Sequence, residues 1–451
     1  MTKVNEAAGS GGNSKGALRI LVCAHDFHPI QSPQSIRVTQ LVSELANRGH
    51  DVQVMTRARG AGVPWTDNPL GIQVHRTSPG GMESIIDTAA RVKRQLRPTN
   101  ASTGHLAPSI PRTTSEGLNW KGRMVAWLRS VLDARVFPDG RSRWVRGAIR
   151  RGRALLRSWS PHVIIGSHEP AAGLMVASSL SRISGIPFIA ELGDPVLTSY
   201  TPERWKSASL ELERQVCRSA AEIVVTSEAT ASLLRARHGP SIAQCSVIPQ
   251  GFPALAGGGP DVVSAAGGLA MVYTGRFYPF RDPMPLVRAV LATPGCTLTI
   301  AGPGLPPELA AAREMHPDVL RFLGSLSHAQ SLELQRGADV LINIGNAGMT
   351  QIPGKLLEYL GSGRPVLHLQ PDAADPAAAI IRKENCGFVA PLDEAAIGAL
   401  LRVLGERKQQ GQLDAGLRLG PEAFFEYRWD RLAVRLEEVC RRAIGSGQRQ
   451  A

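Results

Sequence analysis

The sequence predicts an α/β protein built from two doubly wound domains. Short apolar runs of strand length alternate with helical patterns along most of the chain. The alternation stops after residue 253 and restarts at residue 269, and the residues between are rich in Gly and Ala. A chain of 451 residues is also longer than one ordinary hydrophobic core supports. We therefore expect two domains joined by a linker.

The first domain opens with a strand–helix–strand unit. Residues 18–24 (LRILVCA) form a nearly continuous apolar run, as in a parallel strand that is buried on both faces. A polar loop at 25–34 comes next, followed by apolar residues at helical spacing between 36 and 45 and a terminating Gly49. Residues 51–55 are the second expected strand. Such a unit is the usual start of a doubly wound sheet.

The same alternation predicts the remaining elements. In the first domain we expect strands at 163–165, 187–192, 222–226 and 245–249, with helices at 171–184 and 210–220. In the second we expect strands at 269–273, 297–301, 338–344, 365–369 and 387–389, with a helix at 283–292. The resulting divisions are a disordered tail at 1–17, a first domain at 18–253 with a mobile loop at about 98–118, a linker at 254–268, a second domain at 269–426 and a last helix within 427–451. Open α/β sheets bind ligands beyond the carboxyl ends of their strands, so the expected site is a cleft between the domains.

The composition narrows the class of partner without identifying it. A formal charge of +13 favours an anionic partner, which nucleic acid, a membrane face or a phosphorylated small molecule would satisfy. No recognised nucleic-acid-binding module is evident, so we expect no nucleic-acid partner. The six cysteines lie far apart without metal-ligand spacing, and neither a signal peptide nor an apolar run of membrane-spanning length is found. These features predict a soluble, cytoplasmic protein.

A basic segment at 141–157 has two interpretations. Its seven arginines alternate with apolar residues at helical spacing. One interpretation is a helix whose solvated face carries the arginines while its apolar face packs inward. The other is a surface that contacts an anionic membrane or acceptor.

The first segment with chemical content is Thr274-Gly275-Arg276, followed by Arg281. It comes directly after an expected strand, and Gly275 would let the backbone approach a ligand. Two guanidinium groups within six residues suit a diphosphate, because each can donate paired, charge-assisted hydrogen bonds. The alternative is two surface arginines on a loop.

The second segment is IPGKLLEYLGSGRPV, at 352–366. Pro and Gly frame a short helix, and Gly354 and Lys355 at its start would attract a phosphate. Glu358 lies one turn further on, where a carboxylate can accept hydrogen bonds from a ribose diol. Glu358 could equally be an ordinary i, i+3 partner of Lys355.

These segments resemble the family 4-like glycosyltransferases of the GT-B fold, in which two Rossmann-like domains face each other across a cleft. The resemblance is carried by PGKLLEYLGSGRPVL, YTGRFYPFRDP, AGPG, VIPQGF and the opening LRILVCAHDFHP, in the same order from Leu18 to Glu437. The middle of the chain, with VFPDGRSRW, SPHVIIGSHEP and GIPFIAELGDP, is similar to the branch that assembles bacterial surface polysaccharides and glycoconjugates. The tail from Tyr427 resembles the last helix of the family, which crosses back onto the first domain.

The resemblance implies roles for the second-domain residues. Arg276 and Arg281 match the basic pair at the donor diphosphate, although the second member is usually Lys. Glu358 matches the second Glu of the family's Glu-x7-Glu motif, which binds the nucleotide ribose, while the first Glu is replaced by Thr350. Gly275, Gly354 and Lys355 are the further donor-binding candidates.

The first domain departs from the family at one position. Many relatives have a His where this chain has Gly193, so Asp194 or Glu191 could take a polar role there. His168 ends another expected strand and is either structural or catalytic. The acceptor-side candidates are Glu191 and the loop residues His25, Asp26 and His28, and the catalytic candidates are Arg276, Arg281, Asp194 and His168.

The resemblance implies a hexosyltransferase-type enzyme. It would move a sugar from a nucleotide-sugar donor to a lipid-linked, polysaccharide or other glycan acceptor, with retention of anomeric configuration. No Asp-x-Asp motif is evident, so we expect no metal and no cofactor. An enzyme of this kind would work at the inner face of the cell membrane, held there by the basic segment. The alternatives are an inactive nucleotide-sugar-binding scaffold and a nucleotide-sugar epimerase.

Overall fold

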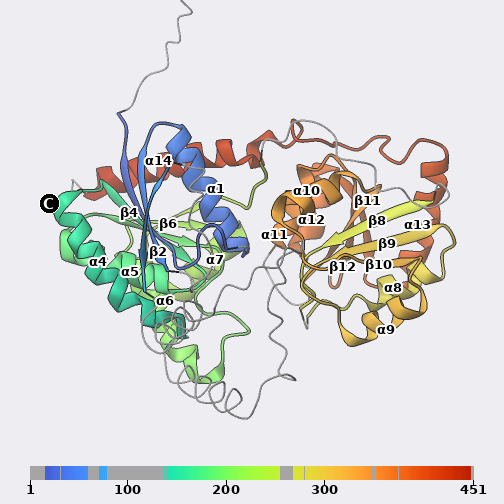
Figure 1. Ribbon diagram of the computed structural model, residues 1–451, viewed down its shortest axis with the longest axis horizontal. Helices are drawn as coiled ribbons and strands as arrows, with labels where there is room; N and C mark the ends of the chain where they lie inside the picture. The colour runs from blue at the N-terminus through green and yellow to red at the C-terminus, as the bar shows by residue number, and fades with distance from the viewer. Residues whose placement is uncertain are drawn as a thin grey trace, which may run out of the picture.

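The computed structural model confirms the α/β class with two doubly wound parallel sheets (Figure 1). It describes residues 16–30, 32–58, 71–78, 137, 140–253, 268–278, 280–346, 352–373 and 375–447. The expected mobile loop at 98–118 lies outside these residues, as do nearly all of the expected tail at 1–17 and linker at 254–268.

The N-terminal sheet has the strand order β3-β2-β1-β4-β5-β6-β7, and all neighbours are parallel. Its strands are β1 (Arg19–Cys23), β2 (Asp51–Arg57), β3 (Gln73–Thr77), β4 (Val163–His168), β5 (Phe188–Leu192), β6 (Glu222–Val225) and β7 (Gln244–Val247). Its helices are α1 (Pro33–Asn47), α4 (Trp144–Ser158), α5 (Ala172–Ser184), α6 (Lys206–Ser219) and α7 (Glu228–His238). The strand order reverses between β1 and β4, which makes the loops after these two strands the expected ligand crevice.

The C-terminal sheet has the order β10-β9-β8-β11-β12-β13 and is also parallel. Its strands are β8 (Leu269–Thr274), β9 (Cys296–Ala301), β10 (Leu320–Phe322), β11 (Val340–Ile344), β12 (Val366–Gln370) and β13 (Gly387–Pro391). Its helices are α8 (Met284–Leu291), α9 (Pro307–Met315), α10 (His328–Arg336), α11 (Gly354–Leu360), α12 (Pro376–Glu384) and α13 (Glu394–Gln409), and α14 (Trp429–Gly447) is the last of the described helices. Here the order reverses between β8 and β11.

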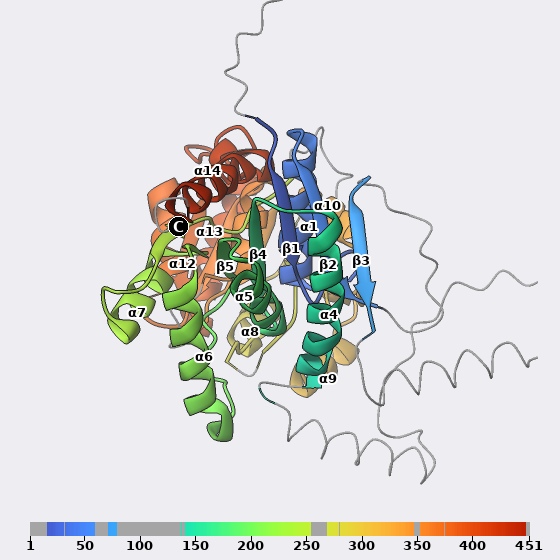
Figure 2. The same ribbon diagram turned by 90° about the vertical axis from the view of Figure 1, so that its left-hand side faces the viewer.

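Successive strand residues alternate between two core layers, because side chains of a strand point to opposite faces. Leu21 and Cys23 of β1 pack with α4, α5, α6 and α7, whereas Ile20 and Val22 pack with α1 and α14. Helices α4 and α6 of the first layer can be followed in Figure 2. The last helix of the chain therefore completes the core of the first domain.

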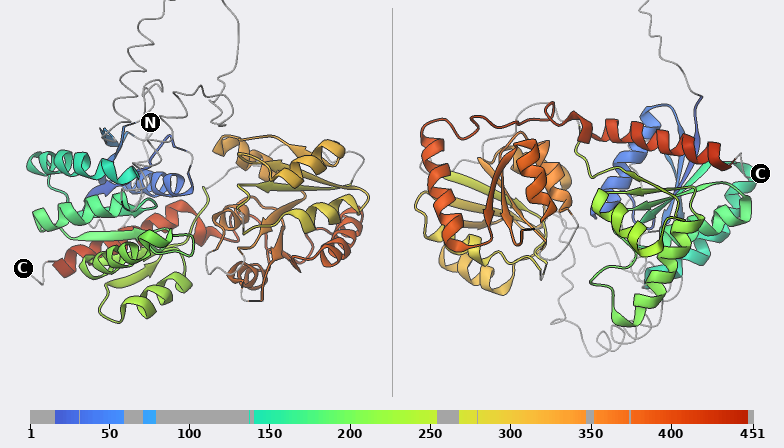
Figure 3. Two further views of the ribbon diagram at one scale, coloured as in Figure 1. Left: turned by 90° about the horizontal axis from the view of Figure 1, so that it is seen from below. Right: turned by 180° about the vertical axis from the view of Figure 1, so that it is seen from behind.

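The chain crosses between the two domains twice, and the two crossings pair with each other. The Phe252 amide donates to the Tyr427 carbonyl, and the Trp429 amide donates to the Phe252 carbonyl. Beyond this point α14 runs along the N-terminal domain (Figure 3) and packs against α1. The carboxylate of Glu437 on α14 accepts hydrogen bonds from Arg48 at 2.7 and 2.9 Å.

Helix α4 packs its apolar face inward, as the first interpretation of the basic segment expects. Trp144, Ala148 and Leu155 are buried against the N-terminal sheet and α5. The opposite face carries the exposed arginines Arg146, Arg150, Arg151, Arg153 and Arg157. No helix among the residues that the structure describes is long and apolar enough to cross a membrane.

Candidate active site

The Thr274-Gly275-Arg276 turn leaves the sheet at the C-terminal crevice between β8 and β11. Gly275 has a φ of +149°, a conformation that residues with a side chain rarely adopt, and its amide donates to the Ala301 carbonyl at 2.9 Å. The backbone oxygen of Arg276 accepts from the Tyr273 hydroxyl at 3.0 Å. The Arg276 side chain is exposed and has no hydrogen-bond or ion-pair partner among the described residues. The turn is therefore fixed while its guanidinium remains available to a ligand.

Arg281 is oriented by the strand on the other side of the crevice. Its Nε donates to Oδ1 of Asn346 at 2.7 Å, and Asn346 lies just beyond the end of β11. Its guanidinium carbon also lies 5.3 Å from the Tyr278 ring centroid and 5.9 Å from that of Phe280. Aromatic faces and an amide oxygen thus set the orientation of a half-buried cation.

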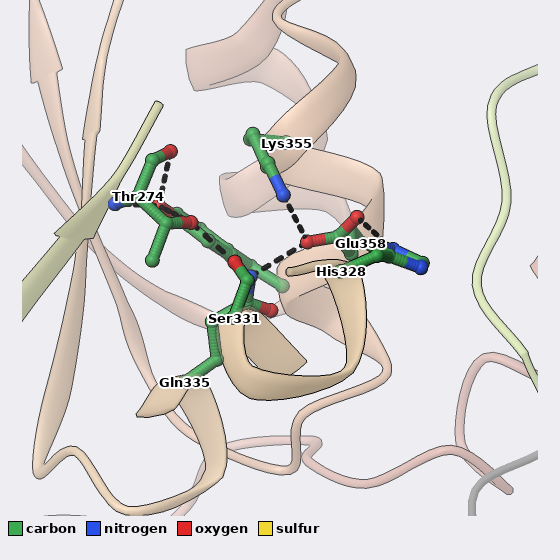
Figure 4. A network of polar contacts seen from close by, with 7 residues as sticks. Thr274, His328, Ser331, Gln335, Lys355 and Glu358 are labelled. Atoms are coloured by element: carbon green, nitrogen blue, oxygen red, sulfur yellow. Dashed lines mark hydrogen bonds and ion pairs between the residues drawn. The ribbon is translucent and has the colours of Figure 1, made fainter. Parts of the chain in front are cut away.

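Glu358 is the centre of a network of polar contacts (Figure 4). Its Oε1 accepts from Nζ of Lys355 at 2.5 Å and from Nε2 of Gln335 at 2.6 Å, and its Oε2 accepts from Nε2 of His328 at 3.0 Å. Burial alone would raise the pKa of Glu358, but the Lys355 charge and the His328 hydrogen bond outweigh it and lower that pKa to about 2. The carboxylate is therefore ionised at any physiological pH.

The network joins the Gly turn to helix α11. Gln335 is completely buried, and its Nε2 also lies 3.1 Å from Oγ1 of Thr274 and 3.2 Å from Oγ of Ser331, so that its second hydrogen reaches one of these two hydroxyls. The backbone amide of Thr274 donates to the Tyr359 hydroxyl at 2.9 Å. The structure thus brings together the donor-side candidates Gly275, Lys355 and Glu358, which lie about eighty residues apart in sequence.

Helix α11 itself is short. It has seven residues, so the charge of Lys355 matters more at its start than the helix dipole does. Gly354 is its first residue and lies beside Gln250, the side chain of which is 3.7 Å from the position of a Cβ at Gly354. The crossing segment between the domains therefore touches the donor-side helix.

At the N-terminal crevice, His168 is the last residue of β4, and Asp194 lies two residues beyond the end of the neighbouring strand β5. Nδ1 of His168 lies 2.7 Å from the Asp194 carbonyl, and because a carbonyl only accepts, that nitrogen carries the proton. Burial and the nearby Glu169 carboxylate raise the pKa of Asp194, although His168 and a hydrogen bond from Tyr200 oppose the shift. The structure therefore places the two catalytic candidates side by side.

Gly193 has a packing reason to differ from the family's His. A Cβ at this position would lie 2.5 Å from Oε1 of Gln34 and 3.0 Å from the His168 carbonyl oxygen. Gln34 cannot easily leave, because its Nε2 donates to Ser167 at 2.9 Å and to Glu191 at 2.5 Å. The space that the family's His would need is occupied by a bonded side chain.

Glu191 is part of the internal structure of the first domain. It is 2% exposed, and its Oε1 accepts from Nε of the equally buried Arg37 at 2.7 Å. Arg37 also donates to the backbone oxygens of Ile248 and Pro249 at 2.8 and 2.7 Å. This ion pair therefore fixes the segment that leads to the second domain, and an acceptor contact by Glu191 stays a prediction.

The loop after β1 holds the other acceptor-side candidates. Nδ1 of the buried His25 lies 2.8 Å from Oδ1 of Asp26, which also accepts from Nε of Arg57 at 3.1 Å. The backbone oxygen of His28 accepts from Arg76 at 3.0 Å. The loop is thus held to β2 and β3, and the candidates lie at the reversal point of the sheet.

Several residues of these networks were not predicted from the sequence, and four of them orient a candidate site residue. They are Arg37, His328, Gln335 and Asn346. Only His328 had a local signal, because it follows Ser327 in a capping box with Gln330. The others become visible only when distant elements meet.

Comparisons with known proteins agree with this architecture. Residues 34–251 match the family described as glycosyl transferase 4-like domain. No curated protein matches the chain in sequence. Among solved structures, the sucrose-phosphate synthase of Thermosynechococcus elongatus superposes with a TM-score of 0.62 and 18% identity, covering 96% of this chain and all of that one.

Two further structures have the same fold. The Anabaena protein HepE, in complex with UDP-glucose, gives a TM-score of 0.57 at 15% identity over 94% of this chain and 99% of its own. The lipopolysaccharide outer core galactosyltransferase WaaB gives a TM-score of 0.53 at 12% sequence identity, over 95% of this chain and 99% of its own. The chain therefore has the GT-B fold of these glycosyltransferases. The family match places a glycosyl transferase 4-like domain at residues 34–251 of this chain.

Proposed function

We propose that the chain transfers a hexose or modified sugar from a nucleotide sugar to a lipid-linked or polysaccharide acceptor, with retention of configuration. The observation that carries this proposal is the pair of cations Arg276 and Arg281 at the C-terminal crevice, together with the ionised Glu358, which Gln335 joins to Thr274 at the start of the same turn. Cations there suit a diphosphate, and the carboxylate suits a ribose diol. The related fold of HepE, which binds UDP-glucose, supports the same class of donor.

The chemistry requires stabilisation of a leaving nucleoside diphosphate. The bond from the anomeric carbon to the phosphate oxygen breaks, and its electron pair leaves with the diphosphate. The acceptor hydroxyl oxygen bonds to the same face of that carbon, and its proton passes to the leaving phosphate oxygen. Arg276 and Arg281 stabilise the charge that develops on the diphosphate. In this scheme no protein base, metal or cofactor is required.

The donor site can be tested with a thermal-shift panel of UDP, GDP, ADP and their sugar derivatives. A ligand that binds only the folded state adds about 2.7 kcal/mol of stability at 100 times its Kd. We expect one nucleotide to raise the melting temperature of the wild type and to lose that effect in Arg276→Ala. The matched control is Arg313→Ala, which removes an exposed arginine on α9. If no nucleotide stabilises the wild type, the proposed donor site is wrong.

The acceptor side of the proposal depends on the exposed face of α4. Arg146, Arg150, Arg153 and Arg157 follow one another at helical spacing, and no ion-pair partner for them is found among the described residues. Such a stripe suits the anionic inner face of a membrane, where lipid-linked acceptors reside. We expect flotation with vesicles containing anionic lipid and its loss when these four arginines are replaced by Gln. No flotation of the wild type would remove the reason for a lipid-linked acceptor.

A non-enzymatic scaffold remains the second candidate. Gly193 and Thr350 replace two polar residues of the family, and the bonded Gln34 keeps the first position small. Nucleotide-sugar binding without transfer to any glycan acceptor, and without donor hydrolysis, would favour the scaffold.

A further inference from the structure

The bonds on Glu358 exceed what a ribose-binding carboxylate can keep. A carboxylate offers about four acceptor positions, two on each oxygen. Lys355 and Gln335 both donate to Oε1, and His328 donates to Oε2. A diol that uses both oxygens needs one position on each. Oε2 of Glu358 still has one free acceptor position, whereas both acceptor positions of its Oε1 are occupied.

One donor on Oε1 must therefore leave when a ribose diol binds both oxygens. Gln335 is completely buried, and its amide nitrogen is enclosed by the Ser331 and Thr274 hydroxyls at 3.2 and 3.1 Å, one of which takes its second hydrogen. Turning the Gln335 side-chain amide around would place its oxygen against the Glu358 carboxylate, and the two oxygens would repel each other. Lys355 has a 33% exposed side chain and a flexible stem, and among the described residues Glu358 is its one hydrogen-bond partner. Lys355 is thus the group that can move.

An ammonium that leaves a carboxylate needs another anion, since an unpaired charge in a partly buried site is costly. The only anion that a nucleotide donor brings is its phosphate. Lys355 lies in the first turn of α11, and Thr274 at the start of the Gly turn is bonded to the adjacent Tyr359. The lysine therefore belongs to the same network as the turn that carries Arg276, connected to it through Glu358 and Gln335.

We propose that Lys355 is an exchangeable residue, which blocks Oε1 of Glu358 in the ligand-free protein and transfers to the donor's phosphate as the ribose takes its place. This inference rests on the proposed function, because it assigns the order of contacts within the same donor site. It follows that phosphate and ribose bind cooperatively. A nucleoside without phosphate must displace Lys355 with no anion to receive it, so it binds poorly.

The wild-type protein allows a direct test by calorimetric titration. Uridine, guanosine and adenosine are titrated with and without saturating inorganic pyrophosphate, and UDP, GDP and ADP are titrated alone. We expect pyrophosphate to tighten the binding of the matching nucleoside by about fivefold or more, the usual size of coupling between two sites. Unchanged or weaker nucleoside binding would overturn the exchange.

A variant separates this role from a structural one. In Lys355→Met, Oε1 is already unblocked, so the nucleoside should bind more tightly than to the wild type, whereas the diphosphate should bind about tenfold more weakly. The pyrophosphate effect should vanish. Lys383→Met is the matched control, because Lys383 is 81% exposed and lies on another helix. A parallel loss for nucleoside and diphosphate would contradict the exchange.

The two proposals fail differently. If the wild type binds none of the three nucleoside diphosphates, the donor site itself is wrong, and the exchange is wrong with it. If a diphosphate binds but its nucleoside shows no coupling to pyrophosphate, only the exchange is wrong.

Discussion

The two sheets carry polar residues at the same edge but use them differently. At the N-terminal crevice, Glu191 is 2% exposed, and its carboxylate accepts hydrogen bonds from Arg37 and Gln34. At the C-terminal crevice, Arg276 is exposed without a partner among the described residues, and Glu358 belongs to a network that reaches the surface through Lys355. One edge is mostly satisfied within the protein, and the other keeps charge available for a ligand. Residue type and position at a strand end therefore do not by themselves distinguish a structural group from a binding group.

The largest expected effect is on folding stability at the N-terminal crevice, which we call the structural edge because its polar groups pair within the protein. Arg37→Ala leaves the buried Glu191 carboxylate without its cation and frees the segment at 248–249. Breaking a buried pair in this way costs about 3–5 kcal/mol. Denaturant unfolding should show this loss, whereas nucleotide binding by the remaining folded protein should be unchanged. A loss below about 1 kcal/mol, as for a surface pair, would remove the contrast between the two edges.

The next effect is on the transfer rate and concerns the C-terminal crevice, which we call the donor-binding edge. Arg281→Ala should lower the transfer rate by about 10² to 10³, because it removes one group that stabilises the leaving diphosphate. Its melting temperature should stay close to that of the wild type. Arg281→Lys keeps the charge but cannot reproduce the Nε bond to Asn346 and the ring contacts, so it should recover only part of the rate. Full recovery by Lys would show that Asn346 orients nothing.

A smaller effect is expected at Gly193. A Cβ there meets Oε1 of Gln34, so Gly193→Ala should cost about 1–3 kcal/mol of folding stability, the usual penalty for overpacking. In a Gln34→Ala background the same substitution should cost clearly less. Thermal unfolding of the four proteins of this double-mutant cycle measures the coupling. Additive effects would show that Gln34 is not the reason for the glycine.

The smallest effect concerns the attachment of α14. Burial raises the pKa of Glu437, but hydrogen bonds from Arg441 and Arg48, together with the imidazole of His50 at 3.1 Å, outweigh it and lower that pKa to about 2. A carboxyl with a depressed folded-state pKa contributes stability above its ordinary pKa of 4.5, and the contribution is lost as the pH falls toward 2. Glu437→Gln should therefore be less stable than the wild type by about 1 kcal/mol at pH 7. Unfolding curves at pH 7 and near pH 2.5 should show the difference shrinking with acid. If the stability difference between the two proteins is the same at both pH values, it arises from packing and not from the charge of Glu437.

Much of the fold could be predicted from local pattern. The apolar run at 18–24 became β1, and the repeating strand–helix alternation predicted both sheets. Strand β3 (QVHRT) was missed, because it has few apolar residues and takes its place by pairing with β2. Helix α14 was predicted, but its burial against the first domain rested on resemblance alone.

The site was only partly predictable. Arg276 and Glu358 stood out, because a glycine turn after a strand and a framed short helix are local signals. The partners Asn346 and Gln335 lie 65 and 23 residues from the groups that they orient, and no local spacing reveals such pairs. The use of Glu191 within the fold was hidden for the same reason, since its partner Arg37 is 154 residues away.

The contrast between the two edges can be tested most directly by measuring melting temperature and nucleotide affinity together on two variants. We predict that Arg276→Ala has the melting temperature of the wild type but no longer binds the nucleotide. We predict that Glu191→Gln has a lower melting temperature but binds the nucleotide as the wild type does. The opposite pattern, with nucleotide binding lost in Glu191→Gln and kept in Arg276→Ala, would contradict the division of the molecule into a structural edge and a donor-binding edge.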